Sequence, residues 1–372
     1  MTSDFKVTPW ETTGEVDYER LIKDFGVEKI TDTLLKKIEK HAGELHYFLR
    51  RKIFFAHRDM NWLLEKYEKG EKFFLYTGRG PSGKTHLGHL VPYIFTKWIQ
   101  DKFDVELYYQ LTDDEKFLFK QDMSLEDTNS LAYENAKDFM ALGFNPKKTH
   151  IIIDSEYSGK LYPQAIKVAK KLTFSTVKSV FGLNDSSNVG QIFFTTIQAV
   201  PAFLPSVLKG KNIPCLIPHA IDQDPHFRIT RDILPKLGYY KPASIQSVFL
   251  PPLEGIAGKM SSSEGQAVYL TDSPNEVRKK IMKYAFSGGK DTVEEHRKKG
   301  GNTDIDISYQ WLRFFEPDDR KLANIKEKYE SGQMLTGEIK QILVDKINKF
   351  LEVLKKNREK AEKSVEKCIL RD

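Results

Sequence analysis

The chain has 372 residues, of which 40% are hydrophobic, 30% charged and 12% aromatic, and this composition predicts a folded protein of two or three domains. Its two cysteines, Cys215 and Cys368, lie far apart, which excludes a disulfide-stapled module and a cysteine-based zinc site. No stretch approaches the ~18 apolar residues of a membrane span, and the N-terminus does not resemble a secretion signal, so we expect a cytoplasmic protein with no membrane partner. The 58 Lys and Arg against 52 Asp and Glu give a net charge of +6, which permits a polyanionic partner without identifying one.

The first 70 residues are polar and carry short amphipathic patterns. Over 32–41, for example, Leu34, Leu35 and Ile38 share one helical face. The arginine pair at 50–51 and the apolar triplet at 53–55 indicate a segment that packs on the next domain rather than one that carries catalytic residues. We therefore expect residues 1–70 to be an N-terminal segment that covers the next domain.

Between residues 71 and 273, short apolar runs alternate with stretches of helical length, which is typical of β-α-β units. A helix should start at Ser124, with Asp127 completing a capping box at its N-terminus, and should end at Gly143. The order predicts an α/β fold, a doubly wound parallel-sheet Rossmann-type catalytic domain whose ligands bind beyond the carboxyl ends of the strands. The expected strands cover 72–77, 105–111, 150–154, 214–217, 244–249 and 267–270, and the other expected helices cover 86–103, 164–181 and 222–237.

After residue 274 the strand patterns stop. Helical patterns cover 276–286, 307–315, 318–331 and 336–365, so residues 274–372 are expected to form a separate all-helical domain. The segment 287–301 is rich in glycine and charge and is predicted to be a connector.

Residues 78–85, GRGPSGKT, match the phosphate-binding pattern G-x-x-x-x-G-K-[ST] between an expected strand and an expected helix. The strand over 150–154 ends at Asp154, which would hold magnesium in a P-loop nucleoside triphosphatase. On these residues alone, such an NTPase is a serious alternative.

A second motif, HLGH at 86–89, overlaps the first. It places His86 and His89 three residues apart at the start of a helix, where free N–H groups and the helix dipole favour a bound polyphosphate, and Gly88 leaves room for a flat ligand. About 170 residues downstream lies GKMSSS at 258–263. Together the two motifs resemble the H-I-G-H and K-M-S-K-S sequences of class I aminoacyl-tRNA synthetases, with Leu87 in place of isoleucine and Ser262 in place of the second lysine.

Further strings narrow the resemblance. Residues 75–82 (LYTGRGPS), 112–116 (TDDEK), 220–228 (AIDQDPHFR) and 285–289 (AFSGG) are similar to the eukaryotic and archaeal branch of the tryptophanyl-tRNA synthetases, and the similarity covers nearly the whole chain. On this resemblance the phosphate-binding pattern belongs to the synthetase's own first strand-to-helix turn. Tyrosyl-tRNA synthetase remains an alternative, because it shares the fold and both motifs, and the P-loop NTPase remains a weaker one.

The resemblance implies a tryptophan–tRNA ligase. In such an enzyme the amino acid carboxylate attacks the α-phosphorus of ATP and the acyl group then passes to tRNA, so no protein nucleophile and no protein-bound metal are needed, and Mg²⁺ arrives with ATP. The implied catalytic residues are His86, His89 and Lys259, and Lys84 is a further cation that could meet phosphate charge. The implied ATP-binding residues are Gly80, Pro81, Ser82, His86, Gly88, His89, Lys259, Met260, Ser261, Ser262 and Ser263. The implied tryptophan-binding residues are Tyr76 and Gln110 at the indole nitrogen, Glu115, Gln198 and Gln223 at the ammonium group, and the aromatic walls Phe194 and Phe227.

The resemblance also implies partners. We expect L-tryptophan and tryptophan tRNA as substrates and a homodimer as the assembly. Residues 321–372 contain thirteen Lys and Arg against nine Asp and Glu, which suits contact with tRNA phosphates. The anticodon is therefore expected to bind the helical domain.

Overall fold

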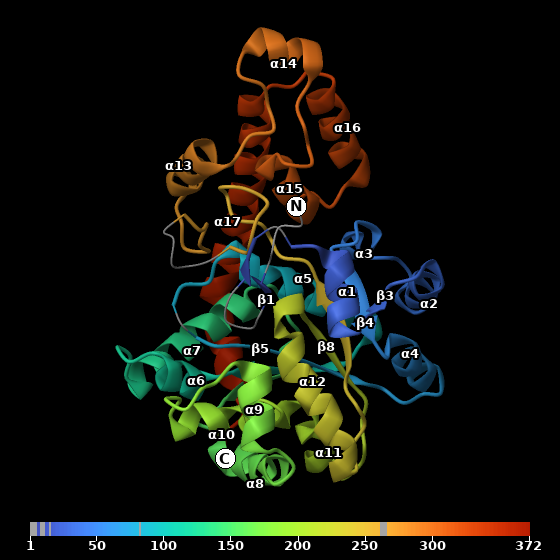
Figure 1. Ribbon diagram of the computed structural model, residues 1–372, viewed down its shortest axis with the longest axis vertical. Coiled ribbons are helices and arrows are strands. Elements are labelled where there is room, and N and C mark those ends of the chain that lie inside the picture. Colours follow the sequence, from blue (N-terminus) through green and yellow to red (C-terminus); the bar gives the residue numbers. More distant parts are fainter. Residues whose placement is uncertain (1–5, 8–11, 15, 82, 261–265) are drawn as a thin grey trace.

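A computed structural model describes residues 6–7, 12–14, 16–81, 83–260 and 266–372 (Figure 1). The sheet strands are β3 (Glu28–Lys29), β4 (Phe54–Arg58), β5 (Phe74–Arg79), β6 (Glu106–Leu111), β7 (Thr149–Ile153), β8 (Cys215–Ala220) and β9 (Ala243–Ser247), and β1 (Lys6–Val7) pairs separately with β2 (Thr12–Thr13). The sheet order is β3-β4-β9-β8-β5-β6-β7, in which β5 to β9 run parallel and β4 and β3 add antiparallel strands at one edge. The predicted α/β class with a doubly wound sheet is therefore confirmed.

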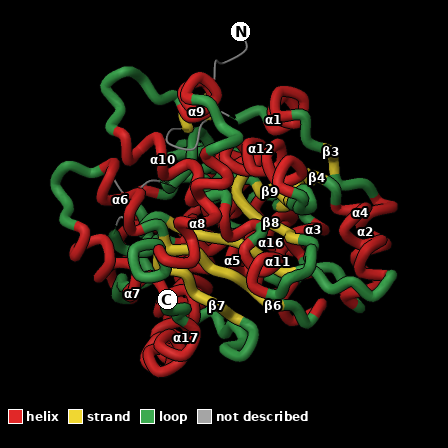
Figure 2. Tube along the Cα trace, turned by 90° about the horizontal axis from the view of Figure 1, so that it is seen from below, coloured by secondary structure: helices red, strands yellow, loops and turns green. Residues whose placement is uncertain are grey.

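Helices lie on both faces of this sheet (Figure 2). The elements before residue 250 include three short 3₁₀ turns, η1 (Val200–Ala202), η2 (Ile221–Gln223) and η3 (Leu234–Leu237). The α-helices in this part are α1 (Tyr18–Phe25), α2 (Asp32–Ala42), α3 (Tyr47–Arg50), α4 (Met60–Glu68), α5 (Leu87–Phe103), α6 (Asp113–Phe119), α7 (Leu125–Met140), α8 (Ser158–Ala169), α9 (Phe174–Phe181), α10 (Val189–Ile197), α11 (Leu204–Leu208) and α12 (Asp224–Ile233).

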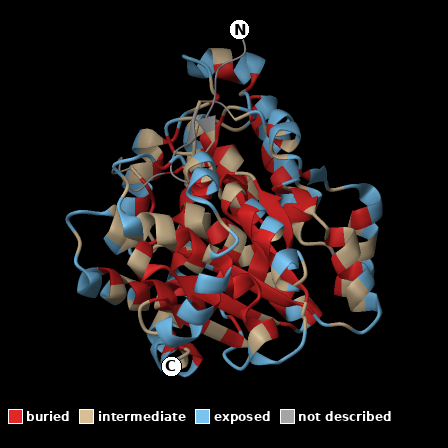
Figure 3. Ribbon diagram, turned by 60° about the horizontal axis from the view of Figure 1, so that its bottom comes forward, coloured by how far each residue is buried: buried red, intermediate tan, exposed pale blue. Residues whose placement is uncertain are grey.

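Alternation along the strands divides the apolar residues between two cores. Leu75, Leu107 and Tyr109 pack on the face that is covered by α5 and α7, whereas Tyr76 and Tyr108 pack on the opposite face with α8 and α9. Both faces of the central strands are thus covered, as the burial colouring shows (Figure 3).

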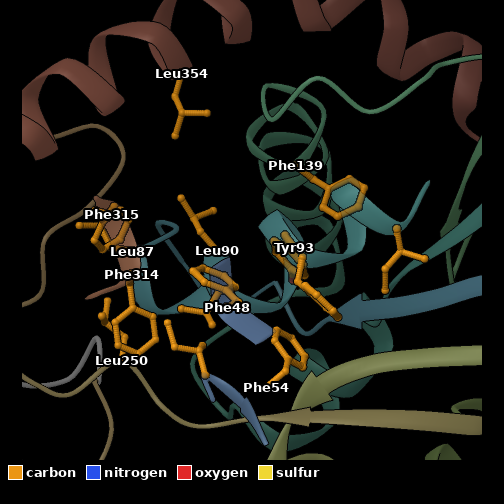
Figure 4. Close-up of a cluster of buried hydrophobic side chains, with 14 of the residues drawn as sticks. Phe48, Phe54, Leu87, Leu90, Tyr93, Phe139, Leu250, Phe314, Phe315 and Leu354 are labelled. Carbon is orange, nitrogen blue, oxygen red and sulfur yellow. The ribbon is translucent and has the colours of Figure 1, made fainter. Parts of the chain in front are cut away.

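The N-terminal segment is part of the seven-stranded sheet rather than only a cover over it. Strand β4 pairs with β9, and Phe48 and Phe54 enter the same core as Leu90 of α5 and Phe139 of α7 (Figure 4). The rings of Phe54 and Phe95 stack with centroids 4.0 Å apart. We therefore expect the catalytic domain not to fold without residues 28–70.

Several predicted elements differ from those observed. The helix expected over 164–181 is two helices, because Thr173 accepts a hydrogen bond from the Thr176 backbone and starts α9 as a new helix. The helix expected over 222–237 is α12 between 3₁₀ turns, and Pro235, which has no N–H to donate, lies in the second turn. The strand expected over 267–270 is a single bridge between His86 and Tyr269.

The C-terminal region is helical as predicted, but its last helix also packs against the α/β part. It contains α13 (Pro274–Tyr284), α14 (Val293–Lys299), α15 (Ile307–Phe315), α16 (Asp319–Glu330) and α17 (Thr336–Cys368), so the expected connector over 287–301 contains a helix. Helix α17 runs from the helical end along the α/β part (Figure 1) and packs against α7 and β7. The Leu370 backbone donates to the Ile151 carbonyl at 2.8 Å, which ties the chain end to the sheet. Within the described part of the chain, no helix is long and apolar enough to cross a membrane.

Candidate active site

A cavity of about 310 Å³ opens at the carboxyl ends of β5, β6 and β8, where a ligand of a doubly wound sheet is expected. It brings together residues that are up to 184 positions apart in the chain, from Tyr76 to Met260. Its lining includes twelve of the predicted site residues: Tyr76, Gly80, His86, Gly88, His89, Gln110, Glu115, Gln198, Gln223, Phe227, Lys259 and Met260.

One part of the cavity is a slot with hydrogen-bonding groups at its base. The Tyr76 hydroxyl lies 2.6 Å from Gln110 Oε1 and 3.0 Å from the Gln198 carbonyl oxygen. The Phe227 ring stands edge-on to Tyr76 with centroids 5.8 Å apart. Burial raises the pKa of Tyr76 well above its ordinary value, so its hydroxyl keeps its proton. The slot therefore offers one apolar wall and a small set of neutral polar atoms.

Next to this slot lie the groups that could hold an ammonium ion. Glu115 accepts hydrogen bonds from Thr112 Oγ1 at 2.6 Å and from Lys116 Nζ at 2.9 Å. The Gln198 Oε1 atom is buried and has no hydrogen-bond partner in the protein, so it can accept from a ligand. Carboxylate and amide oxygens are the acceptors that an amino acid's ammonium group requires.

The two motif histidines lie face to face at the start of α5. Their ring centroids are 3.6 Å apart, and the His86 backbone N–H donates to His89 Nδ1, which leaves His89 Nε2 as its donor atom. Burial, with the positive charges of Arg79 and Lys259, lowers the pKa of His86 to about 3. The pKa of His89 is lowered for the same reasons. At neutral pH both rings are therefore neutral and serve as hydrogen-bond donors rather than as cations.

Glycines at two positions permit the close packing of this region. A Cβ atom on Gly80 would lie 2.1 Å from Lys116 Cε and 2.6 Å from Glu115 Oε2. A Cβ atom on Gly88 would lie 3.1 Å from the His86 ring and 3.4 Å from Met260 Cβ. Gly80 thus leaves room for the Glu115 and Lys116 side chains, and Gly88 lets the first signature motif approach Met260 of the second.

Lys259 is paired across the cavity. Its Nζ lies 2.5 Å from Asp222 Oδ2, and the other carboxylate oxygen, Asp222 Oδ1, is buried without a hydrogen-bond partner. Asp222, Lys116 and Arg79 are not among the predicted site residues, yet all three line the cavity. Lys116 stands in the quoted TDDEK string and Arg79 in the quoted LYTGRGPS string, so the sequence singled out both segments without giving either side chain a role.

Other predicted residues are placed elsewhere. Phe194 is buried in α10, 6.5 Å from the Phe119 ring, and neither it nor the buried Pro81 lines the cavity. Lys84 is exposed and does not line it either. The predicted ATP-binding residues Ser82, Ser261, Ser262 and Ser263 lie outside the described residues.

Among the described residues of 78–85, the carbonyl and hydroxyl oxygens are engaged by an arginine. Arg79 donates to the carbonyl oxygens of Gly83 and Lys84 and, at 2.6 Å, to Thr85 Oγ1. Asp154, the residue that a P-loop enzyme would use for magnesium, instead accepts hydrogen bonds from Gln110. These contacts disfavour the NTPase interpretation.

Comparisons with known proteins agree with this geometry. Residues 68–352 match the family model described as tRNA synthetases class I (W and Y). The chain is 55% identical over 368 residues to the tryptophan–tRNA ligase of Sulfurisphaera tokodaii, covering 98% of this chain and 95% of that protein. The ligase of Pyrococcus furiosus is 50% identical over 370 residues, covering 99% and 94%.

Solved structures give the same result. The tryptophanyl-tRNA synthetase of Plasmodium falciparum is 46% identical with a TM-score of 0.90, covering 95% of this chain and 97% of that one. The Encephalitozoon cuniculi enzyme, solved bound to tryptophan, is 39% identical with a TM-score of 0.88, covering 95% and 98%. The chain therefore belongs to the class I aminoacyl-tRNA synthetases of the tryptophan and tyrosine group. Within that group it belongs with the tryptophan–tRNA ligases of archaeal type, which removes the tyrosine and NTPase alternatives.

Proposed function

We propose that this cavity joins L-tryptophan to ATP and then passes the tryptophanyl group to tryptophan tRNA. A tryptophan carboxylate oxygen attacks the α-phosphorus of ATP, the bond to pyrophosphate breaks, and a tryptophanyl-adenylate forms. A hydroxyl of the terminal tRNA ribose then attacks the acyl carbon, releases AMP and gives up its proton. Neither step needs a protein nucleophile, so the protein contributes position and charge stabilisation.

The observation that carries the proposal is the division of one cavity between two kinds of groups. Tyr76, Gln110 and Phe227 form the slot for the indole ring, whose only polar atom is an N–H that needs an acceptor. Glu115, Gln198 and Gln223 offer oxygens to the ammonium group. Amino acid and nucleotide would therefore meet between β5 and the start of α5.

The nucleotide would be held at the other side of this cavity. His86 and His89 donate from neutral rings, and Lys259 supplies a positive charge. Gly80 and Gly88 line the same cavity. These groups favour the pentavalent α-phosphorus and the departing pyrophosphate over the ground state, which is how positioned donors accelerate such transfers.

Magnesium enters this account as part of the ATP substrate. Among the described residues, no group of three or more His, Cys, Asp or Glu side chains is arranged to hold a metal ion. Asp222 offers the buried, unpartnered Oδ1 beside Lys259, which suits Mg²⁺ that is bound mainly through phosphates. The ion would neutralise phosphate charge.

A homodimer is supported by exposed apolar residues on α10 and on the helices that pack against it. Val189 is 81% exposed, and four other large apolar side chains on helices that pack around α10 are also exposed. We define the α10 patch as Phe117, Tyr162, Ile166, Phe174 and Val189. A second copy of the chain would cover this patch, and the tRNA could then contact both subunits.

Anticodon binding is proposed for the end of the helical region farthest from the sheet. Helices α14 and α16 lie at that end (Figure 1), and Lys298, Lys321 and Lys328 are exposed on them. The second half of α17 instead lies beside α7, where Arg358 Nε donates to Asp138 at 2.7 Å. A cytoplasmic location fits a partner that is a tRNA.

The experiment that tests the slot is tryptophan-dependent ATP–pyrophosphate exchange by Gln110→Ala. Losing one hydrogen bond to a buried N–H should cost about 1–3 kcal/mol, so the KM for tryptophan should rise by about tenfold or more. The KM for ATP should stay unchanged. Equal kinetics for wild type and variant would remove Gln110 from the site.

A further inference from the structure

Asp154 stands directly after β7, and the proposed reaction gives it no role. It is 3% exposed and does not line the cavity. Both of its carboxylate oxygens lie 2.9 Å from Gln110 Nε2. Asp154 therefore lies behind Gln110, on the side away from the slot.

The orientation of the Gln110 amide decides what the slot can bind. An amide presents either an acceptor oxygen or a donor NH₂ group, and the two arrangements have nearly the same shape. The indole N–H only donates, so it needs Gln110 Oε1 facing the slot, as observed beside the Tyr76 hydroxyl. A group behind Gln110 that only accepts would hold this orientation, and a group that donates would reverse it.

Asp154 accepts from Gln110 Nε2, and a second carboxyl group lies on its other side. Asp114 is hydrogen-bonded to Asp154, and burial together with the Asp114 charge raises the pKa of Asp154. Burial likewise raises the pKa of Asp114 to about 7. The raised pKa leaves a proton on Asp154, and the hydrogen bond to Asp114 directs that proton toward Asp114 rather than toward Gln110. Asp154 therefore meets Gln110 Nε2 as an acceptor.

We propose that Asp154 is a positioning residue that sets amino acid specificity, by holding the Gln110 amide with its oxygen toward the slot. The enzyme then selects a bicyclic side chain that donates from its five-membered ring and rejects one that accepts there. This inference rests on the proposed tryptophan slot. It also gives a role to the aspartate whose place after a strand resembled that of a magnesium ligand in a P-loop enzyme.

The test compares tryptophan with L-3-(benzofuran-3-yl)alanine, in which a ring oxygen replaces the indole N–H. The measured quantity is the ratio of kcat/KM for the two amino acids in ATP–pyrophosphate exchange. A site built to accept an N–H should make this ratio at least about 10³ for the wild type. In Asp154→Asn the new amide can accept or donate, so either orientation of Gln110 is supported, and the ratio should fall at least about tenfold.

Two further variants make the result specific. Glu156→Gln removes a carboxylate two residues away that bonds Tyr133, at 2.9 Å, and Arg371 rather than Gln110, so its ratio should match the wild type. Gln110→Ala reports on the slot itself. If Gln110→Ala leaves the ratio unchanged, the slot assignment fails; if it lowers the ratio while Asp154→Asn does not, only the role of Asp154 fails.

If Asp154→Asn does not fold, a second substitution at the same position still tests the proposal. Asp154→Ser, whose hydroxyl also accepts or donates, replaces Asp154→Asn if thermal melting shows that the latter is unfolded, and the same fall is expected. A variant that lowers kcat/KM equally for both amino acids would assign Asp154 a structural role only. A wild type that uses both amino acids equally well would overturn the inference without any variant.

Discussion

Replacing Lys259 by alanine should abolish most adenylation activity, whereas replacing Lys84 should not. Lys259 lines the cavity with His86 and His89, and its Nζ lies 2.5 Å from Asp222 Oδ2. Lys84 belongs to the phosphate-binding pattern but is exposed and outside the cavity. The pair of variants therefore separates synthetase chemistry from P-loop chemistry.

The size of the Lys259 effect has two parts. Losing one preorganised donor to the developing charge should cost about 2.7–4 kcal/mol, or 10²–10³ in kcat. The alanine also leaves the Asp222 carboxylate unpaired beside the phosphates. At an effective dielectric of ~20, two like charges ~4 Å apart repel by about 4 kcal/mol at most, which should raise the KM for ATP.

A double variant separates the two contributions. Adding Asp222→Asn to Lys259→Ala removes the repulsion but does not restore the cation, and it leaves Mg²⁺ a weaker ligand, so the KM for ATP should recover in part while kcat stays about 10²-fold low. The assay is ATP–pyrophosphate exchange with tryptophan, and thermal melting checks folding. Full recovery of kcat in the double variant, or loss of activity in Lys84→Ala with Lys259→Ala intact, would refute the reasoning.

Three other predictions concern pH, assembly and tRNA. Because the pKa of His86 is about 3 in the folded chain and ~6.5 when unfolded, the unfolded state binds more protons between these values, and stability should fall as pH drops through this window. In urea unfolding measured from pH 6.5 to 4.5, His86→Asn should reduce the pH dependence of the unfolding free energy by up to about 1.4 kcal/mol per pH unit. An unchanged pH dependence would contradict the lowered pKa of His86. The double change Phe174→Asp and Val189→Asp should give a monomer in sedimentation, and a wild type that is a fully active 43.0 kDa monomer at micromolar concentration would count against the dimer. Charge reversal of the exposed Lys298, Lys321 and Lys328 on α14 and α16 should lower tRNA charging and make it more salt-sensitive, while pyrophosphate exchange survives. Charge reversal of Lys355, Lys360 and Lys363 on the second half of α17 should lower tRNA charging less. A larger loss of charging from the α17 variant would place the tRNA contact on α17.

Local sequence patterns were enough to predict the elements with strong periodicity and clear ends. The capping box between Ser124 and Asp127 starts α7 as expected, and the helix predicted over 307–315 has those bounds in the structure. The carboxyl ends of β5 and β6 place Tyr76 and Gln110 together, because parallel strands in register end at one edge of the sheet.

What the sequence did not predict depends on contacts between distant segments. Strand β4 could not be assigned to the sheet, because its partner β9 lies about 190 residues further along the chain. The pairing of Lys259 with Asp222 and the contact of Asp154 with Gln110 are tertiary contacts, and short sequence motifs do not predict them. The place of Phe194 in the interior is of the same kind, since an aromatic residue on a helix can face a core or a ligand.

The central claim is that this cavity selects tryptophan for activation by ATP, and amino-acid-dependent ATP–pyrophosphate exchange by the full-length wild type measures that selection directly. The twenty amino acids should be assayed separately at one concentration with MgATP. The account predicts exchange with tryptophan and at least about 10³-fold less with tyrosine, which cannot place an N–H at Gln110. Exchange that is stimulated by tyrosine and not by tryptophan would contradict it.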